Sequence, residues 1–156
     1  MDIIIDSRER KPYTFADAAK HINSTTVEKL DTGDYTVRGC EDILCIDRKR
    51  SVGEVKDNIL EDRFTAELER MRDFKYKYLL LEFSVEDVRI WPRGSGLPKH
   101  VQRKIRVSGN RILGRLLEIQ LEYGVQVLFC GDRKHAEYMA VGLMKKVHDE
   151  FSNTDA

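Results

Sequence analysis

The sequence is poor in the residues that mark several protein classes. It has three cysteines, three prolines and one tryptophan among 156 residues. The cysteines, Cys40, Cys45 and Cys130, are odd in number and widely spaced, so they form neither a CxxC metal clip nor a disulfide framework. Such cysteines suit a reducing compartment, and we expect a cytoplasmic protein. The four histidines form no HxxxH or HxH pair, so no zinc site is expected.

Long apolar runs are also missing. Nothing approaches the roughly 18 residues that a membrane span needs, and no charged-then-apolar leader opens the chain, so we expect no membrane attachment. With 41% hydrophobic residues, the chain can bury the core of one domain. We expect that single domain to cover residues 1–151 and residues 152–156 to form a disordered tail.

No sign of charge dominates, because the formal net charge is zero. The distribution is uneven, however. The segment from Arg89 to Arg115, here called the basic band, holds eight Lys or Arg and no Asp or Glu, so the remaining residues carry a net charge of −8. A basic band predicts a surface that meets a polyanion, although a solvated helical face is equally compatible with it. Its candidate DNA-contacting residues are Trp91, Arg93, Lys99, Arg103, Lys104 and Arg106. Trp91 could stack on a base or anchor the core.

Apolar patterns alternate between strand and helix along the chain. Short β-branched or dense apolar runs predict strands at residues 3–5, 25–30, from 35, 43–46, 78–83 and 125–129. Helical spacing predicts one long amphipathic helix from 52 to 71 after a Ser51 cap, another after Ser108 that stops at Gly124, and a last one through residues 136–147. These elements predict an α/β fold with three α/β/α layers around a central mixed sheet.

Three aspartates, Asp6, Asp34 and Asp47, each lie at a predicted strand boundary. Hard divalent ions such as Mg²⁺ take oxygen ligands of this kind, and they serve phosphoryl chemistry. Lys49 follows Asp47 by two residues and therefore points to the same face of a strand, whereas Arg48 points to the other. Taken alone, this Asp-x-Lys spacing is more often a surface salt bridge; it gains weight from the other aspartates.

Four segments in order carry a family resemblance: Ile3-Ile4-Ile5-Asp6-Ser7-Arg8-Glu9, Gly33-Asp34-Tyr35, Ile46-Asp47-Arg48-Lys49 and residues 62–68, Asp-Arg-Phe-Thr-Ala-Glu-Leu. Together they resemble the nuclease domain of the XPF-type (ERCC4-like) endonucleases, and the similarity extends into residues 113–132. The resemblance implies a restriction-endonuclease-like fold. It also implies Mg²⁺- or Mn²⁺-dependent cutting of DNA at branched, flap or junction structures.

The same resemblance assigns roles to individual residues. It implies that Asp34 and Asp47 bind the metal together with the backbone carbonyl of Arg48, and that Lys49 is the catalytic lysine. Arg48 would be a phosphate-facing or structural cation, and Asp6 and Glu9 would support the site. Arg8 would fix its loop through Glu9 or contact DNA. Arg63 and Glu67 would buttress the site, with Arg63 also a candidate for DNA contact.

The sequence departs from the family pattern at two positions. Asp47 stands where the family usually has Glu, and Gly53 falls where an acidic residue is usual, with Glu54 next to it. Glu54 could replace that acid or could only cap the helix that follows Ser51. No helix-hairpin-helix module fits after Val147, so we expect a stand-alone nuclease domain, as in compact bacteriophage versions.

Family members pair through their nuclease domains, which favours a homodimer formed by the apolar faces of the last two helices, unless those faces only cover the sheet. The leading hypothesis is a DNA endonuclease that acts in recombination, repair or phage genome processing. A catalytically silent DNA-binding subunit and a nuclease for RNA or single strands are the alternatives.

Overall fold

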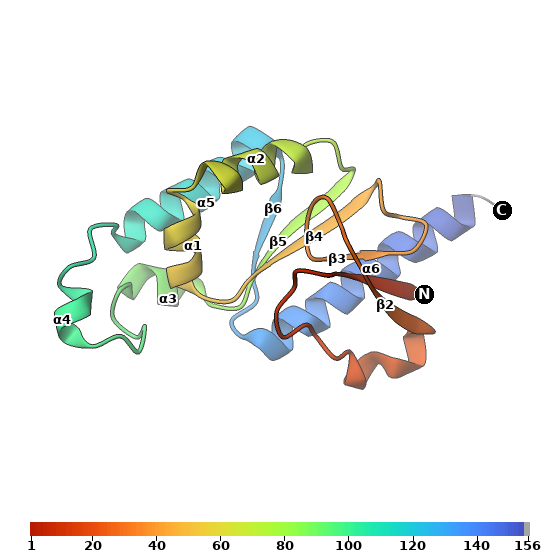
Figure 1. The fold of residues 1–156 in the computed structure, drawn as a ribbon, viewed down its shortest axis with the longest axis horizontal. Helices are drawn as coiled ribbons and strands as arrows, with labels where there is room; N and C mark the ends of the chain where they lie inside the picture. Colours follow the sequence, from red (N-terminus) through yellow and green to blue (C-terminus); the bar gives the residue numbers. More distant parts are fainter. Residues whose placement is uncertain (155–156) are drawn as a thin grey trace.

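A computed structural model describes residues 1–154 as a six-stranded mixed sheet with helices on both faces (Figure 1). The strands lie in the order β2-β1-β3-β4-β5-β6. The β1–β3 and β3–β4 pairs are antiparallel, and the β1–β2, β4–β5 and β5–β6 pairs are parallel. The strands are β1 (Asp2–Asp6), β2 (Ser24–Glu28), β3 (Tyr35–Val37), β4 (Leu44–Lys49), β5 (Tyr76–Leu81) and β6 (Gln126–Phe129).

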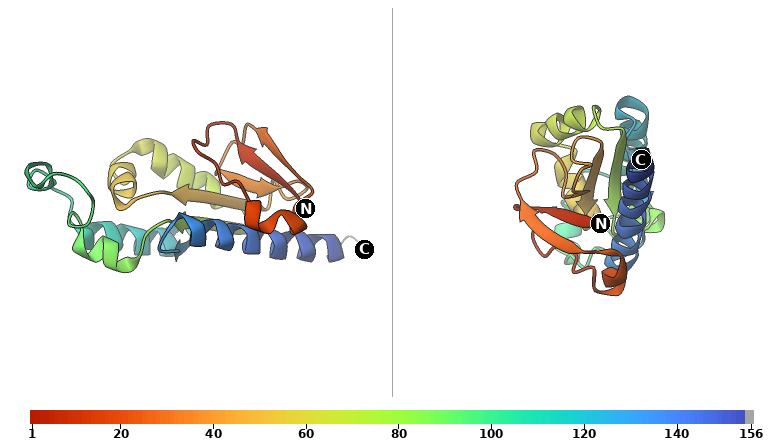
Figure 2. Two further views of the ribbon diagram at one scale, coloured as in Figure 1. Left: turned by 90° about the horizontal axis from the view of Figure 1, so that it is seen from below. Right: turned by 90° about the vertical axis from the view of Figure 1, so that its right-hand side faces the viewer.

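The helices form two layers, with α1 and α2 on one side of β4 and α6 on the other (Figure 2). Buried residues of α1, α2, α3 and α5 share one core with the sheet, and those of α6 share a second. The helical elements are η1 (Ala16–His21, a 3₁₀ helix), α1 (Val52–Asn58), α2 (Asp62–Met71), α3 (Val85–Ile90), α4 (Lys99–Gln102), α5 (Gly109–Tyr123) and α6 (Arg133–Thr154). The expected α/β class with three layers and a mixed sheet is confirmed.

Strand alternation separates the two cores. Leu44 and Ile46 of β4 face α6, whereas Cys45 between them faces the α1 and α2 side. Because successive side chains of a strand point to opposite faces, Asp47 and Lys49 continue the face of Cys45, and Arg48 continues the face of Ile46. This alternation places the acid–lysine pair beneath α1 and α2.

The helix expected from 52 to 71 is two helices. The chain leaves helical geometry at Glu61, whose φ of −105° and ψ of 130° are extended, and α2 then begins at Asp62. The spacing of the apolar residues explains this break, because Ile59 and Phe64 are five residues apart and cannot both lie on one helical stripe. The caps at Ser51 and Ser108 are confirmed: each hydroxyl accepts a hydrogen bond from the backbone three residues on.

Two further differences concern the ends of elements. Short helices α3 and α4, on either side of residues 91–98, were not expected. The last helix continues through Thr154, whose hydroxyl donates to the Glu150 carbonyl. Ser152 to Thr154 are therefore helical rather than part of a disordered tail, and positions 155 and 156 lie outside the described residues. None of the helices in residues 1–154 is long and apolar enough to cross a membrane.

Candidate active site

The sequence-predicted acids gather around an open cavity of about 640 Å³ between the sheet and the α1–α2 layer. β4 contributes Asp47 and Lys49, the turn before β3 contributes Asp34, and α2 contributes Glu67. Asp34 N–H donates to the Ile46 carbonyl at 2.8 Å, and Asp6 N–H donates to the Asp34 carbonyl at 2.8 Å. Backbone pairing of neighbouring strands thus brings these segments together.

Asp47 and Lys49 form a buried ion pair, with Lys49 Nζ 3.0 Å from Asp47 Oδ2. The ammonium also lies 4.9 Å from the centre of the Phe64 ring. Burial alone would lower the pKa of Lys49, but the carboxylates of Asp47 and Glu67 more than offset it, so this pKa lies above its ordinary value. Lys49 is therefore a cation at neutral pH.

Asp34 is held by the backbone of β4, because the Arg48 N–H donates to Asp34 Oδ2 at 2.7 Å. Burial, followed by the negative charges of Asp47 and Glu9, raises the pKa of Asp34 well above its ordinary value. Gly33 makes the preceding turn with a φ of +81°, which side chains other than glycine rarely adopt. The turn aims Asp34 at the cavity.

Glu67 lines the cavity together with Asp34 and Asp47, so it does more than buttress the site from behind. Its Oε1 accepts a hydrogen bond from the Gly33 N–H at 3.4 Å. Burial, and then the neighbouring Asp47 carboxylate, raise the pKa of Glu67 to about 7. Carboxylates that repel one another in this way need a cation to be ionised together. In the sequence, Glu67 was marked by the resembling segment 62–68 and by its (i, i+4) placement relative to Arg63 on one helix.

The metal-binding potential of the site lies in a small number of carboxylate oxygens. Within residues 1–154, no group of three or more His, Cys, Asp or Glu side chains is already arranged to hold a metal ion. Asp47 Oδ2 is buried and forms the ion pair with Lys49. It accepts no hydrogen bond from any other group within residues 1–154. An Mg²⁺ ion is commonly held by one or two carboxylates plus waters and substrate phosphate. Asp34 and Asp47 fit that donor set.

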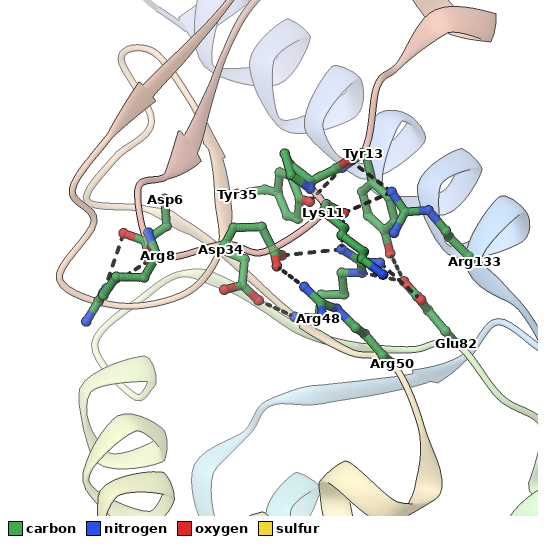
Figure 3. Close-up of polar contacts among 12 residues, drawn as sticks. Asp6, Arg8, Lys11, Tyr13, Asp34, Tyr35, Arg48, Arg50, Glu82 and Arg133 are labelled. Carbon is green, nitrogen blue, oxygen red and sulfur yellow. Dashed lines mark hydrogen bonds and ion pairs between the residues drawn. The ribbon is translucent and has the colours of Figure 1, made fainter. Parts of the chain in front are cut away.

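Arg48 points away from the cavity into a polar network on the other face of β4 (Figure 3). Its guanidinium donates to Glu82 at 2.5 and 3.3 Å and to the Lys11 carbonyl at 3.0 Å. It also lies 4.4 Å from the centre of the Tyr13 ring. Of its two expected roles, the structure supports the structural cation. Sequence reasoning missed Glu82 and Tyr13; the signal for Glu82 was a charged residue within the expected strand 78–83.

Asp6 and its neighbours hold the loops around the site. The Asp6 carboxylate accepts a hydrogen bond from Arg8 Nε at 2.9 Å (Figure 3). It accepts another from the Leu30 N–H at 2.8 Å. Arg8 therefore fixes its loop through Asp6, whereas Glu9 was the expected partner. Glu9 instead pairs with Arg50 at 2.9 Å and with Arg48 at 3.7 Å. The two acids connect separate loops around the site.

Glu54 is engaged at the start of α1. Its carboxylate accepts a hydrogen bond from the Arg50 N–H at 2.8 Å, while its own N–H donates to Ser51 Oγ. These bonds match the capping interpretation of Glu54. Gly53 leaves the family's acidic position without a side chain, and the carboxylate nearest Asp47 comes from α2 instead.

The basic band divides into paired and unpaired residues. Arg89 and Arg115 form ion pairs with neighbouring glutamates, as in a solvated helical face. Arg8 and Arg63 are also exposed, and each pairs with a nearby acid. The exposed band residues that form no ion pair within residues 1–154 are Arg93, Lys99, Arg103, Lys104, Arg106 and Arg111.

Trp91 differs from its neighbours, because its side chain is only 8% exposed and belongs to the core with Val88 and Phe83. Of its two expected roles, Trp91 therefore takes that of a core anchor, and its ring does not lie open on the surface. One edge of the indole nevertheless lines a second cavity beside the active site.

The apolar stripes of the last two helices cover the sheet. Ile112, Leu116 and Ile119 of α5 are fully buried, as are Ala140 and Met144 of α6. The apolar residues that stay exposed on these helices are Leu117, Leu121, Tyr138, Met139 and Phe151.

The fold, with its carboxylates and lysine at a cavity beside the sheet, defines the restriction-endonuclease-like class. The ERCC4 domain model matches residues 5–141. The chain therefore belongs to the ERCC4 domain family, as its motifs had suggested.

Solved structures agree with this fold. XPF from Aeropyrum pernix superposes with a TM-score of 0.69 at 15% identity, over 94% of this chain and 61% of that one. XPF from Aeropyrum pernix in complex with DNA gives 0.68 at 16% identity, over 96% and 66%. The chain thus spans just under two thirds of the length of these relatives. No curated protein matches the sequence.

Proposed function

We propose that this chain is a metal-dependent DNA endonuclease that cuts branched, flap or junction DNA. The observation that carries the proposal is the buried Asp47–Lys49 pair beside Asp34 and Glu67 in an open cavity. Burying like charges together is costly unless a cation joins them. A fold without catalytic work has no physical reason to hold this arrangement, which is the argument against a silent DNA-binding subunit.

Asp34 and Asp47, with the Arg48 backbone carbonyl, are the proposed ligands of Mg²⁺ or its substitute Mn²⁺. When bound, the ion supplies a Lewis acid that makes a water more acidic and relieves charge on the scissile phosphate. The Asp47 oxygen without a hydrogen bond and the raised pKa of Asp34 both support a cation here. Asp47 is one methylene shorter than glutamate, so the ion would sit closer to the backbone of β4.

Lys49 acts in this proposal as a fixed positive charge. Its raised pKa favours stabilisation of the charge that develops on the phosphate over acceptance of a proton from water. Arg48 holds β4 in position through Glu82, and its N–H orients Asp34. Asp6 and Glu9 fix the loops that border the cavity.

Five of the unpaired residues of the basic band form the proposed DNA surface. Arg93, Lys99, Arg103, Lys104 and Arg106 are exposed and free to meet phosphates. Arg8 and Arg63 border the cavity itself, where their guanidinium groups could contact the strand being cut.

The test is cleavage of labelled duplex, flap, fork and four-way-junction DNA with Mg²⁺, Mn²⁺ or a chelator. Wild type should cut only with metal and should prefer a branched substrate. Asp34→Asn and Lys49→Ala should each abolish cutting while a mobility-shift assay shows DNA binding largely intact. Lys146→Ala, at an exposed lysine of α6 that does not line the cavity, is the matched control. Normal cutting by Lys49→Ala would mean that the site is wrongly assigned; binding by wild type without any cutting would favour the silent subunit.

We also propose a homodimer and a cytoplasmic location, in the host cell if a bacteriophage encodes the chain. The exposed Leu117 and Leu121 on α5 and Tyr138 on α6 support the dimer. Three free cysteines support a reducing compartment. Light scattering of the purified protein should give twice the chain mass, and Leu121→Arg should return it to the monomer.

A further inference from the structure

A second cavity, of about 370 Å³, lies between the start of α1 and the α3 end of the basic band. Arg50 lines both this cavity and the active-site cavity, so the two are neighbours across one side chain. The walls that matter for its chemistry are Gly53, Phe83, Trp91 and Arg93. Its volume is at the lower end of the range for small-ligand sites.

The cavity is open beside Trp91 because Gly53 has no side chain to fill it. A Cβ atom at Gly53 would meet the Trp91 ring at 3.4 Å, which is ordinary contact, and a longer side chain would fill the space. The family usually carries an acid at this position, whereas here the missing side chain leaves room beside the indole. The departure at Gly53 therefore has a structural consequence apart from the metal.

The walls combine apolar surface with positive charge. Trp91 and Phe83 supply aromatic surface, and Arg50 and Arg93 supply guanidinium groups. Asp87 also lines the cavity, but its carboxylate is engaged by the N–H and hydroxyl of Ser84 at the start of α3. A planar base against apolar walls, with its phosphate on arginine, has the complementary chemistry.

We propose that this cavity binds one unpaired nucleotide of the DNA strand next to the scissile phosphate. The proposal rests on the proposed nuclease function, because it places the nucleotide on the strand that enters the active site past Arg50. A base inside a duplex is stacked on both faces and cannot enter without leaving the helix. The cavity therefore favours substrates that already have an unpaired nucleotide beside the cut.

Trp91 is the only tryptophan of the chain, so its fluorescence reports on this cavity alone. The probes are a single-stranded thymidylate of roughly five nucleotides, its abasic analogue and a blunt duplex, titrated into Asp34→Asn protein with a chelator. The thymidylate should change the emission and saturate at a concentration at least about tenfold below the duplex. The abasic analogue should bind about tenfold more weakly than the thymidylate, as expected when one base–aromatic contact is lost.

Gly53→Leu should abolish the emission change and remove the preference for flap over duplex in cleavage by the otherwise wild-type enzyme. Gly142→Leu is the matched control, because an added Cβ at that helical glycine would have nothing within 4 Å. Arg93→Ala, at an exposed residue without an ion pair, should weaken thymidylate binding even if Gly53→Leu fails to fold.

The outcomes separate the two proposals. A thymidylate response in a protein that never cuts DNA would support the nucleotide site and refute the nuclease. Metal-dependent cutting with an unchanged emission, or with the same flap preference in Gly53→Leu, would refute the nucleotide site and leave the nuclease standing.

Discussion

The Tyr13 hydroxyl donates a hydrogen bond of 2.7 Å to Glu82 Oε2, across 69 residues of sequence. The same carboxylate pairs with Arg48, and both charged side chains are almost fully buried. Glu82 therefore joins the loop after β1 and the end of β5 to β4, the strand that carries the proposed catalytic residues. Breaking this pair should lower the free energy of unfolding strongly, because removing one partner leaves the other as an uncompensated buried charge.

Glu82→Ala is expected to destabilise the protein by about 3–5 kcal/mol and to reduce cleavage by displacing β4. Urea unfolding followed by circular dichroism measures the first effect. The matched control is Glu86→Ala, which removes the exposed partner of Arg89 and should leave the unfolding midpoint nearly unchanged. Equal effects of the two substitutions would show that the Arg48 network is not a structural support.

Glu67 should make stability depend on pH in the absence of metal. In the unfolded chain Glu67 takes up its proton near pH 4.5, whereas in the folded protein it does so near pH 7. Between these values the folded state binds more protons, so the free energy of unfolding should fall as pH rises from about 4.5 to about 7. The loss is on the order of 3 kcal/mol.

Urea titrations across this pH range, with a chelator present, measure that loss. Glu67→Gln should make the profile shallower, with the remaining slope due to Asp34, whose pKa is also raised. Glu69→Gln, at an exposed position on the same helix, should leave the profile as in wild type. A profile that is equally steep in Glu67→Gln would assign the titration to other groups.

Neutralising Arg103, Lys104 and Arg106 together should weaken DNA binding without abolishing the cleavage step. Each phosphate contact contributes about 0.9 to the slope of log affinity against log salt, so the slope should fall by roughly two to three. Fluorescence anisotropy over a range of salt concentrations measures it. A triple variant of the exposed Lys20, Lys29 and Lys146 is the charge-matched control and should keep the wild-type slope.

Gly33→Ala should cost more stability than a positive φ alone explains. Its Cβ would lie 2.6 Å from Cys45 Sγ and 3.1 Å from the Ile46 carbonyl oxygen. Gly39→Ala is the control, because Gly39 has a φ of +89° and nothing within 4 Å of an added Cβ. We expect about 1–2 kcal/mol for Gly39→Ala and a further 1–3 kcal/mol for Gly33→Ala. Similar unfolding free energies for both variants would contradict this packing argument.

Local patterns in the sequence were enough to predict most of the fold. The strand runs, the Ser51 and Ser108 caps and the Gly124 stop each follow from nearest-neighbour chemistry, and the structure has them all. The alternation on β4 also followed directly, since a period of two separates Asp47 and Lys49 from Arg48. The break between α1 and α2 was visible only in the five-residue step from Ile59 to Phe64.

The rest depends on contacts between distant segments. Nothing near Glu82 in the sequence shows that Tyr13 and Arg48 will meet it. Trp91 lies in a basic segment, yet packing of α3 against the core buries it. Glu67 reaches Asp47 only because α2 turns back over β4 after the break at Glu61. Such pairings are set by tertiary packing, which periodicity does not encode.

The position of β4 between two cores limits how the site could be transferred. Three consecutive residues, Asp47, Arg48 and Lys49, depend on different neighbours: α1 and α2 above the sheet, and the Tyr13–Glu82 network below it. Grafting this tripeptide onto the strand of another scaffold would carry its side chains without the two environments that hold them. A designer seeking this site would have to transplant both faces of the strand together.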